Sequence, residues 1–423
     1  MSDHTTQVLV VGAGLSGLAC ARTLHDHGIE CRVLESSSRT GGRLGSTFVG
    51  GVVCDKGFQV SMSNYECLER MVPRDSLVRH GFTRGAVLVM EDRRVRVIDP
   101  KVEPLSAIRL LFSGIGGWRD LRAANRCRRL ASGSRIGIDP ESSARSLIES
   151  VGFTTSFIES FIRPFFTGVL LDEDLDVPAG RFLSTLDRFA RGTAEIPAGG
   201  MQKIADVMAE PIKHRIQLNQ TVTGVGSGWV ELDDGSRLTS DHVVMAVPFD
   251  TACRMAGHPQ PVDDEPWSST AALHFTSMNS HPPDPIIYLN ATGKGHLNLA
   301  CIPSVVAPDY APPGTHSIVA SLKPWKHSGK QMKFTSEMID DIRVEAGALL
   351  GVDSSEWRHI HTDIIPRALP RHIPKQSCFS DSDRIHATGD WANWPSIDSS
   401  VENGMGLAQR LVDLMTDQCT PLK

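Results

Sequence analysis

The first forty residues alternate apolar runs with glycines, in a pattern that predicts a strand, a helix and a second strand. Residues 8–11 are all aliphatic, as in a parallel strand covered on both faces. Apolar side chains then recur at helical spacing, and Gly28 is expected to end this helix; they are Leu15, Leu18, Ala21 and Leu24. Residues 31–34 are expected to form the next short strand. This order predicts a Rossmann-like α/β unit.

The turn between the first strand and the helix carries a nucleotide-binding pattern. Residues 12–17, Gly-Ala-Gly-Leu-Ser-Gly, match GxGxxG, and Glu35 follows the second strand 23 positions after Gly12. Gly12 permits a tight turn, Gly14 lets backbone N–H groups approach a pyrophosphate, and Gly17 allows the helix to pack closely on the strand. The helix N-terminus attracts phosphates, and Glu35 can accept hydrogen bonds from ribose hydroxyls. We therefore predict a dinucleotide cofactor bound by Gly12, Gly14, Leu15, Ser16, Gly17, Glu35 and Ser36.

A second glycine pair identifies the cofactor. Residues 39–43, Arg-Thr-Gly-Gly-Arg, complete the pattern Glu-x-x-x-Arg-x-Gly-Gly-Arg that begins at Glu35. They add anion-binding backbone and a fixed cation near the pyrophosphate. With this pattern the sequence resembles the flavoprotein family that includes flavin amine oxidases, protoporphyrinogen oxidase and phytoene desaturases, and its C-terminal segment from Gly389 looks closest to the endings of the desaturase-like members. The resemblance implies that the cofactor is FAD and that Gly42 and Arg43 contact it.

Residues 55–59, Asp-Lys-Gly-Phe-Gln, resemble the segment that runs beside the flavin in that family. The resemblance places Gly57, Phe58 and Gln59 near the flavin ring. For Gln59, an ordinary role in a loop stays open as the alternative. By the same resemblance, Val222 would meet the adenine end of FAD.

The C-terminal part of the chain carries another segment of the resembled family. The pair Gly389-Asp390 ends a short strand and would meet the pyrophosphate and the ribityl chain. An amphipathic helix follows, and the resemblance points its N-terminus, with Ile397 and Ser400, at the flavin. The Ser399-x-x-Glu402 pattern predicts a capping box at the start of this helix.

The resemblance also implies the domain organisation of an α/β protein. We expect a Rossmann-like FAD-binding domain built from three discontinuous segments, residues 1–65, 190–250 and 375–423. An α+β substrate-binding domain is expected from residues 66–189 and 251–374. Local patterns in these segments predict a hairpin over 87–97, helices over 142–151 and 155–161, and a strand over 270–275.

No second strand–GxGxxG–helix unit that could receive NAD(P)H occurs in the sequence. Residues 224–228 repeat the glycine spacing, but no helix pattern follows them, so we interpret them as a turn in a hairpin. Electrons are therefore expected to come from the substrate. They would pass to oxygen, a quinone or another carrier, or return to the substrate.

Two departures from the amine oxidases bear on the substrate. Those enzymes hold a water near the flavin with a lysine, and residues 270–275 contain none; His274 is the nearest titratable group there, either catalytic or structural. Their aromatic cage takes a tyrosine where this chain has Ser396, and the chain has only 3 tyrosines in all. Trp391 and Trp394 could replace part of this cage, but we interpret them as packing residues.

We therefore predict an enzyme that removes a hydride from a lipophilic, isoprenoid-like or polycyclic substrate, in a reaction of the desaturase or dehydrogenase type. Such a transfer depends on orientation of a C–H bond over the flavin more than on a strong base, so we name no catalytic residue. A flavin amine oxidase, a flavin-dependent isomerase and a non-catalytic binding protein of the GDP-dissociation-inhibitor type are the alternatives.

Composition excludes several other classes of protein. The 423 residues carry a net charge of −6, which gives no reason to expect nucleic acid as a partner. The 9 cysteines are scattered without a CxxC pair, which is typical of reduced thiols in a cytoplasmic protein and indicates neither a disulfide framework nor a metal site. We expect no signal peptide and no membrane-spanning helix.

One segment departs from this acidic balance. Residues 101–135 carry eight Lys and Arg against two acids, interleaved with apolar and aromatic residues. A basic helix of this kind can lie on an anionic membrane surface, so membrane association through this segment is one interpretation. A solvated face of the substrate-binding domain is the other.

Overall fold

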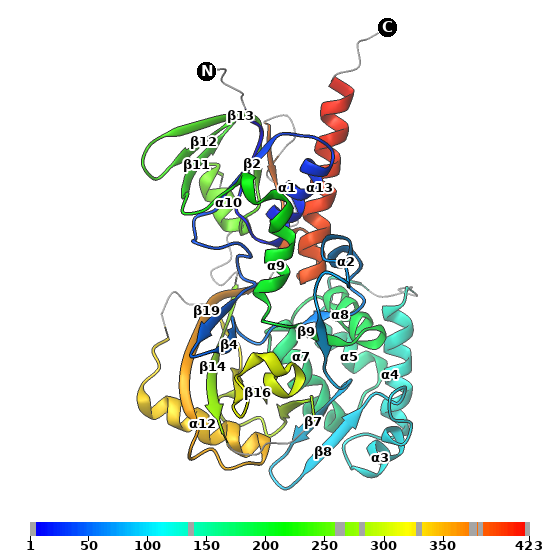
Figure 1. The fold of residues 1–423 in the computed structure, drawn as a ribbon. Coiled ribbons are helices and arrows are strands. Elements are labelled where there is room, and N and C mark those ends of the chain that lie inside the picture. Colours follow the sequence, from blue (N-terminus) through cyan, green and yellow to red (C-terminus); the bar gives the residue numbers. More distant parts are fainter. Residues whose placement is uncertain are drawn as a thin grey trace.

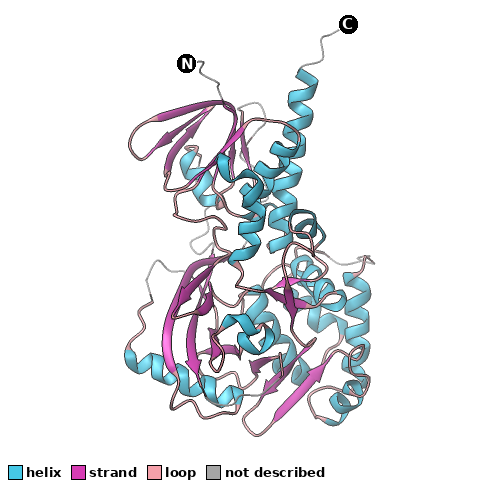
Figure 2. Ribbon diagram, in the orientation of Figure 1, coloured by secondary structure: helices cyan, strands magenta, loops and turns pink. Residues whose placement is uncertain are grey.

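The chain folds into two halves, and the first strand and the last helix lie in the same one (Figure 1). The structure is a computed structural model that describes residues 6–133, 139–258, 267–278, 284–326, 332–371, 379 and 384–418. One half is built on a mainly parallel sheet and the other on a mainly antiparallel sheet, and helices pack around both (Figure 2). The predicted α/β fold is confirmed.

A seven-stranded sheet forms the centre of the upper half. In spatial order its strands are β10 (Ile216–Gln217), β2 (Cys31–Leu34), β1 (Thr6–Val11), β13 (Arg237–Met245), β12 (Trp229–Leu232) and β11 (Val222–Gly226), and β20 (Ile385–Ala387) pairs with β13. β1 lies parallel between β2 and β13, and residues 8–11 are at most 3% exposed, so the predicted buried strand is confirmed. All seven strands come from the three segments that we propose as the FAD-binding domain.

The interpretation of residues 224–228 as a turn is also confirmed. They lie in the antiparallel hairpin of β11 and β12, which continues antiparallel into the first part of β13. Since a strand rather than a helix follows these glycines, they form no second nucleotide-binding turn.

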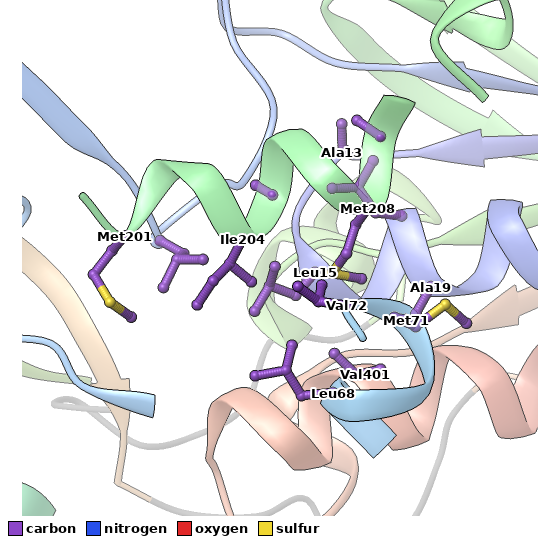
Figure 3. Close-up of a cluster of buried hydrophobic side chains, with 14 of the residues drawn as sticks. Ala13, Leu15, Ala19, Leu68, Met71, Val72, Met201, Ile204, Met208 and Val401 are labelled. Atoms are coloured by element: carbon purple, nitrogen blue, oxygen red, sulfur yellow. The ribbon is translucent and has the colours of Figure 1, made fainter. Parts of the chain in front are cut away.

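The helices of the upper half pack against this sheet and against one another. They are α1 (Leu15–Asp26), α2 (Glu66–Met71), α9 (Gln202–Ala209), the 3-10 helix η2 (Glu210–Arg215), α10 (Phe249–Met255), the 3-10 helix η5 (Asp390–Ala392) and α13 (Ile397–Gln418). Figure 3 shows Leu15, Ile204, Met208 and Val401 meeting in one buried cluster. α1 and α13 approach closely because Gly404 has no side chain: a Cβ there would lie 2.2 Å from the carbonyl oxygen of Ser16.

The lower half is built on an eight-stranded sheet. Its strands are β18 (Trp325–Lys326), β14 (Trp267–Ser277), β17 (His316–Leu322), β16 (Leu297–Cys301), β15 (Ile287–Asn290), β7 (Gly85–Val89) and β8 (Arg94–Ile98), and β19 (Arg358–Pro370) pairs with β14. The predicted hairpin is β7 and β8, and the predicted strand over 270–275 lies within β14. Two small sheets are formed by segments through which the chain passes from one half to the other. One pairs β3 (Ser46–Val49) with β4 (Val52–Asp55). In the other, β9 (Ala194–Pro197) lies between β5 (Ser61–Met62) and β6 (Arg79–Gly81).

Helices fill the remainder of the lower half. They are α3 (Ser106–Phe112), α4 (Trp118–Ala131), α5 (Ala144–Val151), α6 (Thr155–Phe157), the π-helix η1 (Ile158–Ile162), α7 (Arg163–Leu170), α8 (Ala179–Arg191), α11 (Pro303–Val306), the 3-10 helix η3 (Pro308–Tyr310) and α12 (Ser336–Leu350). α5 and the run from α6 into η1 confirm the two helices predicted here. Pro164 lies in the first turn of α7, where a missing N–H needs no partner.

Seven cysteines lie in the described residues, all are free, and only Cys67 is not buried; Cys378 and Cys419 lie outside the described residues. Within the described ranges, no helix has the length and apolar character to cross a membrane. Across the same ranges, no group of three or more His, Cys, Asp or Glu side chains is arranged to hold a metal ion.

Candidate functional site

The glycine turn after β1 has the geometry that its sequence predicts. Gly12 has a φ of +101°, and a Cβ there would lie 2.7 Å from the carbonyl oxygen of Ala246. A Cβ on Gly17 would lie 2.0 Å from the carbonyl oxygen of Gly12. Both positions therefore need glycine for the fold itself. Gly14 differs, because a Cβ there would meet nothing within 4 Å. The turn thus leaves open space at Gly14, at the N-terminus of α1, where phosphate groups bind well.

The two residues after Gly14 belong to the helix rather than to the surface. The side chain of Leu15 is buried in the apolar cluster, and the hydroxyl of Ser16 donates a hydrogen bond to the carbonyl oxygen of Ser400 at 2.7 Å. Ser16 therefore ties the start of α1 to the first turns of α13. The side chains of Leu15 and Ser16 are therefore engaged within the protein, and a cofactor at the turn would meet these two residues through their backbone.

Glu35 lies at the end of β2 and is 7% exposed. Its Oε2 accepts a hydrogen bond from the backbone N–H of Ala13 at 2.7 Å. Its Oε1 accepts from the N–H and the hydroxyl of Ser37, at 2.9 and 2.8 Å, while the Ser36 hydroxyl is 3.5 Å away. The carboxylate is therefore fixed beside the glycine turn. Val222 starts β11 and is buried, two residues after Gln220, whose N–H donates to the carbonyl oxygen of Glu35.

The second glycine pair lies directly against the first. The N–H of Gly41 donates to the carbonyl oxygen of Ala13 at 2.8 Å, and a Cβ on Gly42 would lie 3.2 Å from Cα of Gly14. Arg39 folds back onto its own loop, donating to the carbonyl oxygens of Thr40, Gly42 and Leu44. The fold therefore brings the glycine turn of residues 12–17 and the Gly41-Gly42 pair together, as the predicted pyrophosphate site requires.

Arg43 and Asp390 form an ion pair across the two ends of the chain. Arg43 Nη2 lies 2.7 Å from Asp390 Oδ1, and the carboxylate is buried. Arg43 also donates to the carbonyl oxygen of Ala368 on β19, and its guanidinium lies over the ring of Trp267 with 5.4 Å to the centroid. Gly389 is held by Asn403 of α13, whose Nδ2 donates to its carbonyl oxygen at 2.8 Å. This pairing joins the loop after the second glycine pair to the C-terminal segment of the chain.

The start of α13 corrects one prediction. The capping box is formed by Ser396 and Ser399, not by Ser399 and Glu402: the Ser396 hydroxyl accepts from the Ser399 N–H at 3.0 Å, and the Ser399 hydroxyl accepts from the Ser396 N–H at 2.9 Å. The helix therefore begins three residues earlier, at Ile397, which is half-buried against the apolar cluster. The Ser400 hydroxyl donates to the Ser396 carbonyl oxygen. The pattern Ser-x-x-Ser forms the same two reciprocal hydrogen bonds as Ser-x-x-Glu. A search for an acidic residue at the third helical position does not find it.

Asp398 is a residue of this region that the sequence analysis missed. Its side chain is 2% exposed, and its Oδ2 lies 3.0 Å from Nη2 of Arg188 on α8. Its Oδ1 accepts from the backbone N–H of Leu68 on α2 at 2.9 Å. One carboxylate thus joins the last helix to two helices from the middle of the chain. The signal in the sequence was an acid in the first turn of a helix, which is too common to single out.

Residues 57–59 border a small, mostly apolar cavity of about 20 Å³, enough for a single water. Gly57 has a φ of +75°, and Phe58 packs edge-on against Phe82 with ring centroids 5.9 Å apart. Gln59 Nε2 donates to the carbonyl oxygen of Arg43 at 3.1 Å, and its Oε1 has no hydrogen-bond partner among the described residues. The lining side chains are Val53, Asp55, Phe58, Gln59, Phe82, Ile196, His274, Pro303, Tyr310 and Val319.

Two titratable pairs lie at this cavity. Asp55 Oδ2 accepts from the hydroxyl of Tyr310 at 2.7 Å, and burial and the neighbouring Asp55 raise the pKa of Tyr310, so its hydroxyl stays a donor. His274 Nε2 lies 3.4 Å from Oδ2 of Asp363 on β19, yet neither atom makes a hydrogen bond within the described residues. The two atoms therefore form a loose buried contact at this wall rather than a hydrogen bond.

Asp55 gives the stability of the protein a defined pH dependence. Burial raises the pKa of its carboxyl above the usual value, against the lowering effect of hydrogen bonds from Ser46, Met201 and Tyr310. Between the unfolded and folded pKa values the folded state then binds more protons, so this contribution to stability falls as pH rises through that window. We expect the free energy of unfolding of the wild type, minus that of Asp55→Asn, to decrease as pH rises above about 4.

Urea unfolding of both proteins at a series of pH values measures this difference. Asp55→Asn removes the titration and turns one of the two acceptor oxygens into an amide donor, and the cost of that change does not vary with pH in this range. A difference that grows with pH would mean that the hydrogen bonds outweigh burial and that the pKa of Asp55 is lowered in the folded state.

The aromatic residues do not form a tyrosine cage. All three tyrosines lie in described residues: Tyr310 bonds to Asp55, Tyr288 is buried in β15, and Tyr65 lies under the guanidinium of Arg188. The Trp391 indole donates to the carbonyl oxygen of Val247 at 3.0 Å, and its ring packs on Phe249. The Trp394 ring lies against α8, where a Cβ on Gly180 would be 2.6 Å from it. The interpretation of both tryptophans as packing residues is confirmed.

These residues fit FAD. The open space at Gly14 suits a pyrophosphate, and the fixed Glu35 carboxylate lies beside it for a ribose. Gln59 leaves a buried carbonyl oxygen without a partner next to the segment that would border the flavin.

Comparison with known proteins agrees with this geometry. The family model described as flavin containing amine oxidoreductase matches residues 15–281 of the chain. Human lysine-specific histone demethylase 2 is 25% identical over 261 residues, which cover 58% of this chain and 30% of that protein. Protoporphyrinogen oxidase 2 of Arabidopsis thaliana is 45% identical over 63 residues, 14% of this chain and 12% of that protein. The chain therefore spans less than a third of the length of these curated relatives in the matched regions.

Solved structures share the fold over nearly the whole chain. Reduced UDP-galactopyranose mutase aligns with a TM-score of 0.70 and 16% identity, covering 97% of this chain and 96% of that one. Putrescine oxidase bound to putrescine aligns with a TM-score of 0.69 and 17% identity, covering 97% of this chain and 99% of that one. At these identities the likeness concerns the fold.

Proposed function

The chain belongs to the family of flavin-containing amine oxidoreductases, and from this premise we propose that this FAD-dependent oxidoreductase removes a hydride from a carbon atom of a lipophilic, isoprenoid-like or polycyclic substrate. The reaction is a desaturation or dehydrogenation. Its substrate binds between the sheet of the lower half and the segment of residues 57–59.

The apolar wall beside residues 57–59 carries this proposal. Most side chains that line the cavity there are aliphatic or aromatic, and two of the polar ones, Tyr310 and Asp55, are hydrogen-bonded to each other. β14 contributes His274 to this lining and contains no lysine. An apolar wall favours an apolar substrate because it offers few hydrogen bonds to replace those that a polar group makes with water.

The chain's own residues hold and orient the reactants. The pyrophosphate would be held by the backbone of residues 12–17 and of the Gly41-Gly42 pair, and Glu35 would accept a hydrogen bond from a ribose hydroxyl. The ion pair of Arg43 with Asp390 fixes the loop that follows the second glycine pair. FAD held by these residues would supply the hydride-accepting chemistry. The N-terminus of α13, capped by Ser396, directs partial positive charge toward the flavin site, which stabilises negative charge there.

The electrons leave to oxygen, a quinone or another small carrier. This part of the proposal rests on the sequence, which has a single GxGxxG turn followed by a helix. A protein reduced by NAD(P)H usually provides a second site of this kind.

Anaerobic titration of the FAD-loaded protein tests the substrate class. We expect the flavin absorbance to bleach with members of a panel of isoprenoid alkenes and polycyclic hydrocarbons, and to recover when oxygen or a quinone is added. Dithionite serves as the control that the flavin is reducible. Bleaching by amines alone would overturn the proposal.

Amine oxidation is the second candidate. The match to the histone demethylase covers 58% of this chain, and the putrescine oxidase fold covers 97%. The same titration separates the two candidates, because panels of primary, secondary and polyamines are included. Reduction by an amine with release of an aldehyde would identify the protein as an amine oxidase despite the missing lysine.

A further inference from the structure

Large apolar side chains are exposed on α3 and on the segments that flank it. Ten large hydrophobic residues are exposed in the described part of the chain, and five of them fall between positions 102 and 118. These five define an apolar edge: Val102, Leu105, Ile108, Phe112 and Trp118, which are 51% to 86% exposed. Such clustering within 17 positions is not the scatter of single apolar residues that soluble surfaces show.

The apolar edge follows the geometry of the helix. Leu105, Ile108 and Phe112 are spaced three and four residues apart, so they lie on one face of α3. Phe112 is 86% exposed and ends the helix, and Trp118 begins α4 after five residues. The edge therefore runs along α3 and onto the first residue of α4.

A stripe of arginines continues from this edge along α4. Arg119, Arg122, Arg126 and Arg129 recur every three or four residues, and all four are exposed. The opposite face of α4 packs into the core of the lower half through Ala123, Cys127 and Ala131. α4 thus presents one apolar face to the protein and one cationic face to the solvent.

The positive charge of this stripe is not neutralised nearby. Asp120 is buried and accepts hydrogen bonds from the N–H groups of Gly117 and Thr154, at 2.8 and 2.7 Å. Glu103 pairs with Arg109. Over the ranges that the structure describes, no carboxylate oxygen lies within 4.0 Å of a nitrogen of Arg122, Arg126 or Arg129. Arg135, the last basic residue of the segment, lies outside the described residues.

We propose that α3 and α4 dock on an anionic lipid bilayer, a property that goes beyond the proposed function and does not depend on it. Phe112 and Trp118 insert at the level of the headgroups, where aromatic side chains are favoured, and the arginine stripe contacts lipid phosphates. Figure 1 shows both helices at one side of the lower half, away from the sheet of the upper half, so docking leaves the FAD site uncovered.

Charge decides between a membrane and a second copy of the chain as the occupant. Two copies that met through this surface would bring two arginine stripes together, and like charges disfavour that contact. An anionic bilayer can contact both the arginine stripe and the apolar edge, because its negative phosphates lie beside an apolar interior.

Flotation with vesicles tests the proposal on the full-length, FAD-loaded protein. We expect it to float with vesicles of phosphatidylcholine mixed with phosphatidylglycerol and not with phosphatidylcholine alone. Binding should weaken at about 0.5 M salt, because exposed charges are then screened. The variants Phe112→Ser/Trp118→Ser and Arg122→Glu/Arg126→Glu should each lower the partition coefficient at least about tenfold.

Matched controls change the same chemistry elsewhere. Val344→Ser removes an exposed apolar residue from α12, and Lys203→Glu/Lys213→Glu makes the same change of net charge on the upper half. These variants should bind as the wild type does. All the substituted side chains are exposed, so melting temperatures should stay close to that of the wild type.

Three results would overturn the proposal. One is absence of flotation with anionic vesicles at low salt. Another is equal loss of binding in the control variants. The third is a dimer in solution that Phe112→Ser/Trp118→Ser converts to a monomer, which would identify the surface as an interface between copies.

Discussion

Replacing Gly14 with alanine is expected to weaken FAD binding about 100-fold, or ~2.7 kcal/mol, while leaving the fold of the FAD-free protein unchanged. Gly14 has φ −69° and ψ 176°, an extended conformation that alanine adopts without strain. A Cβ there meets no protein atom within 4 Å. The methyl group instead enters the space that we assign to the pyrophosphate. Titration of the FAD-free variant with FAD, followed by flavin fluorescence, measures the affinity.

Two other glycines supply the contrast that this prediction needs. Gly17→Ala places its Cβ 2.0 Å from the Gly12 carbonyl oxygen, so it should lower the melting temperature even without FAD. Gly406→Ala on α13 meets only the far end of Arg410 at 3.9 Å, so FAD affinity should be kept. Wild-type FAD affinity in Gly14→Ala would show that the pyrophosphate does not lie at this turn.

Replacing Asp398 with alanine is expected to lower the free energy of unfolding by about 3 kcal/mol. The substitution removes a buried carboxylate that accepts from Leu68 and pairs with Arg188. The Leu68 N–H is then left buried without its acceptor, and Arg188 loses its counter-charge. Because Arg188 is 31% exposed, water can solvate it in part, which keeps the loss at the lower end of the range for broken buried pairs.

Urea unfolding of Asp398→Ala, Asp398→Asn and Asp413→Ala measures this loss. Asp413 is exposed on the same helix and accepts a hydrogen bond from the Gln409 side chain at 3.0 Å, so its replacement controls for the change of residue type. Asp398→Asn keeps an acceptor for Leu68 and should lie between the other two. A loss in Asp398→Ala within about 0.5 kcal/mol of that in Asp413→Ala would show that the carboxylate does not join the helices as described.

Local sequence predicted the elements of the nucleotide-binding half well. The aliphatic run at residues 8–11 is the buried strand β1, and the helix after the glycines ends just before Gly28, which has a φ of +76°. These predictions succeed because burial on both faces and a positive φ each restrict the choice of residue at single positions. The predicted position of the capping box was wrong by three residues, because a serine can take the place of the glutamate in both hydrogen bonds of the box.

By itself, then, the sequence determined the glycine turns and the acid after β2, and its resemblance to a flavoprotein family implied FAD as the cofactor. Only the tertiary structure decided which distant residues meet. It brought Arg43 to Asp390, Asp398 to Leu68 and Arg188, and His274 to Asp363, pairs separated by 89 or more positions in the chain. It also decided that the apolar residues from 102 to 118 remain exposed. Periodicity along a chain records which side chains share a face, whereas the neighbour of that face depends on how the whole chain packs.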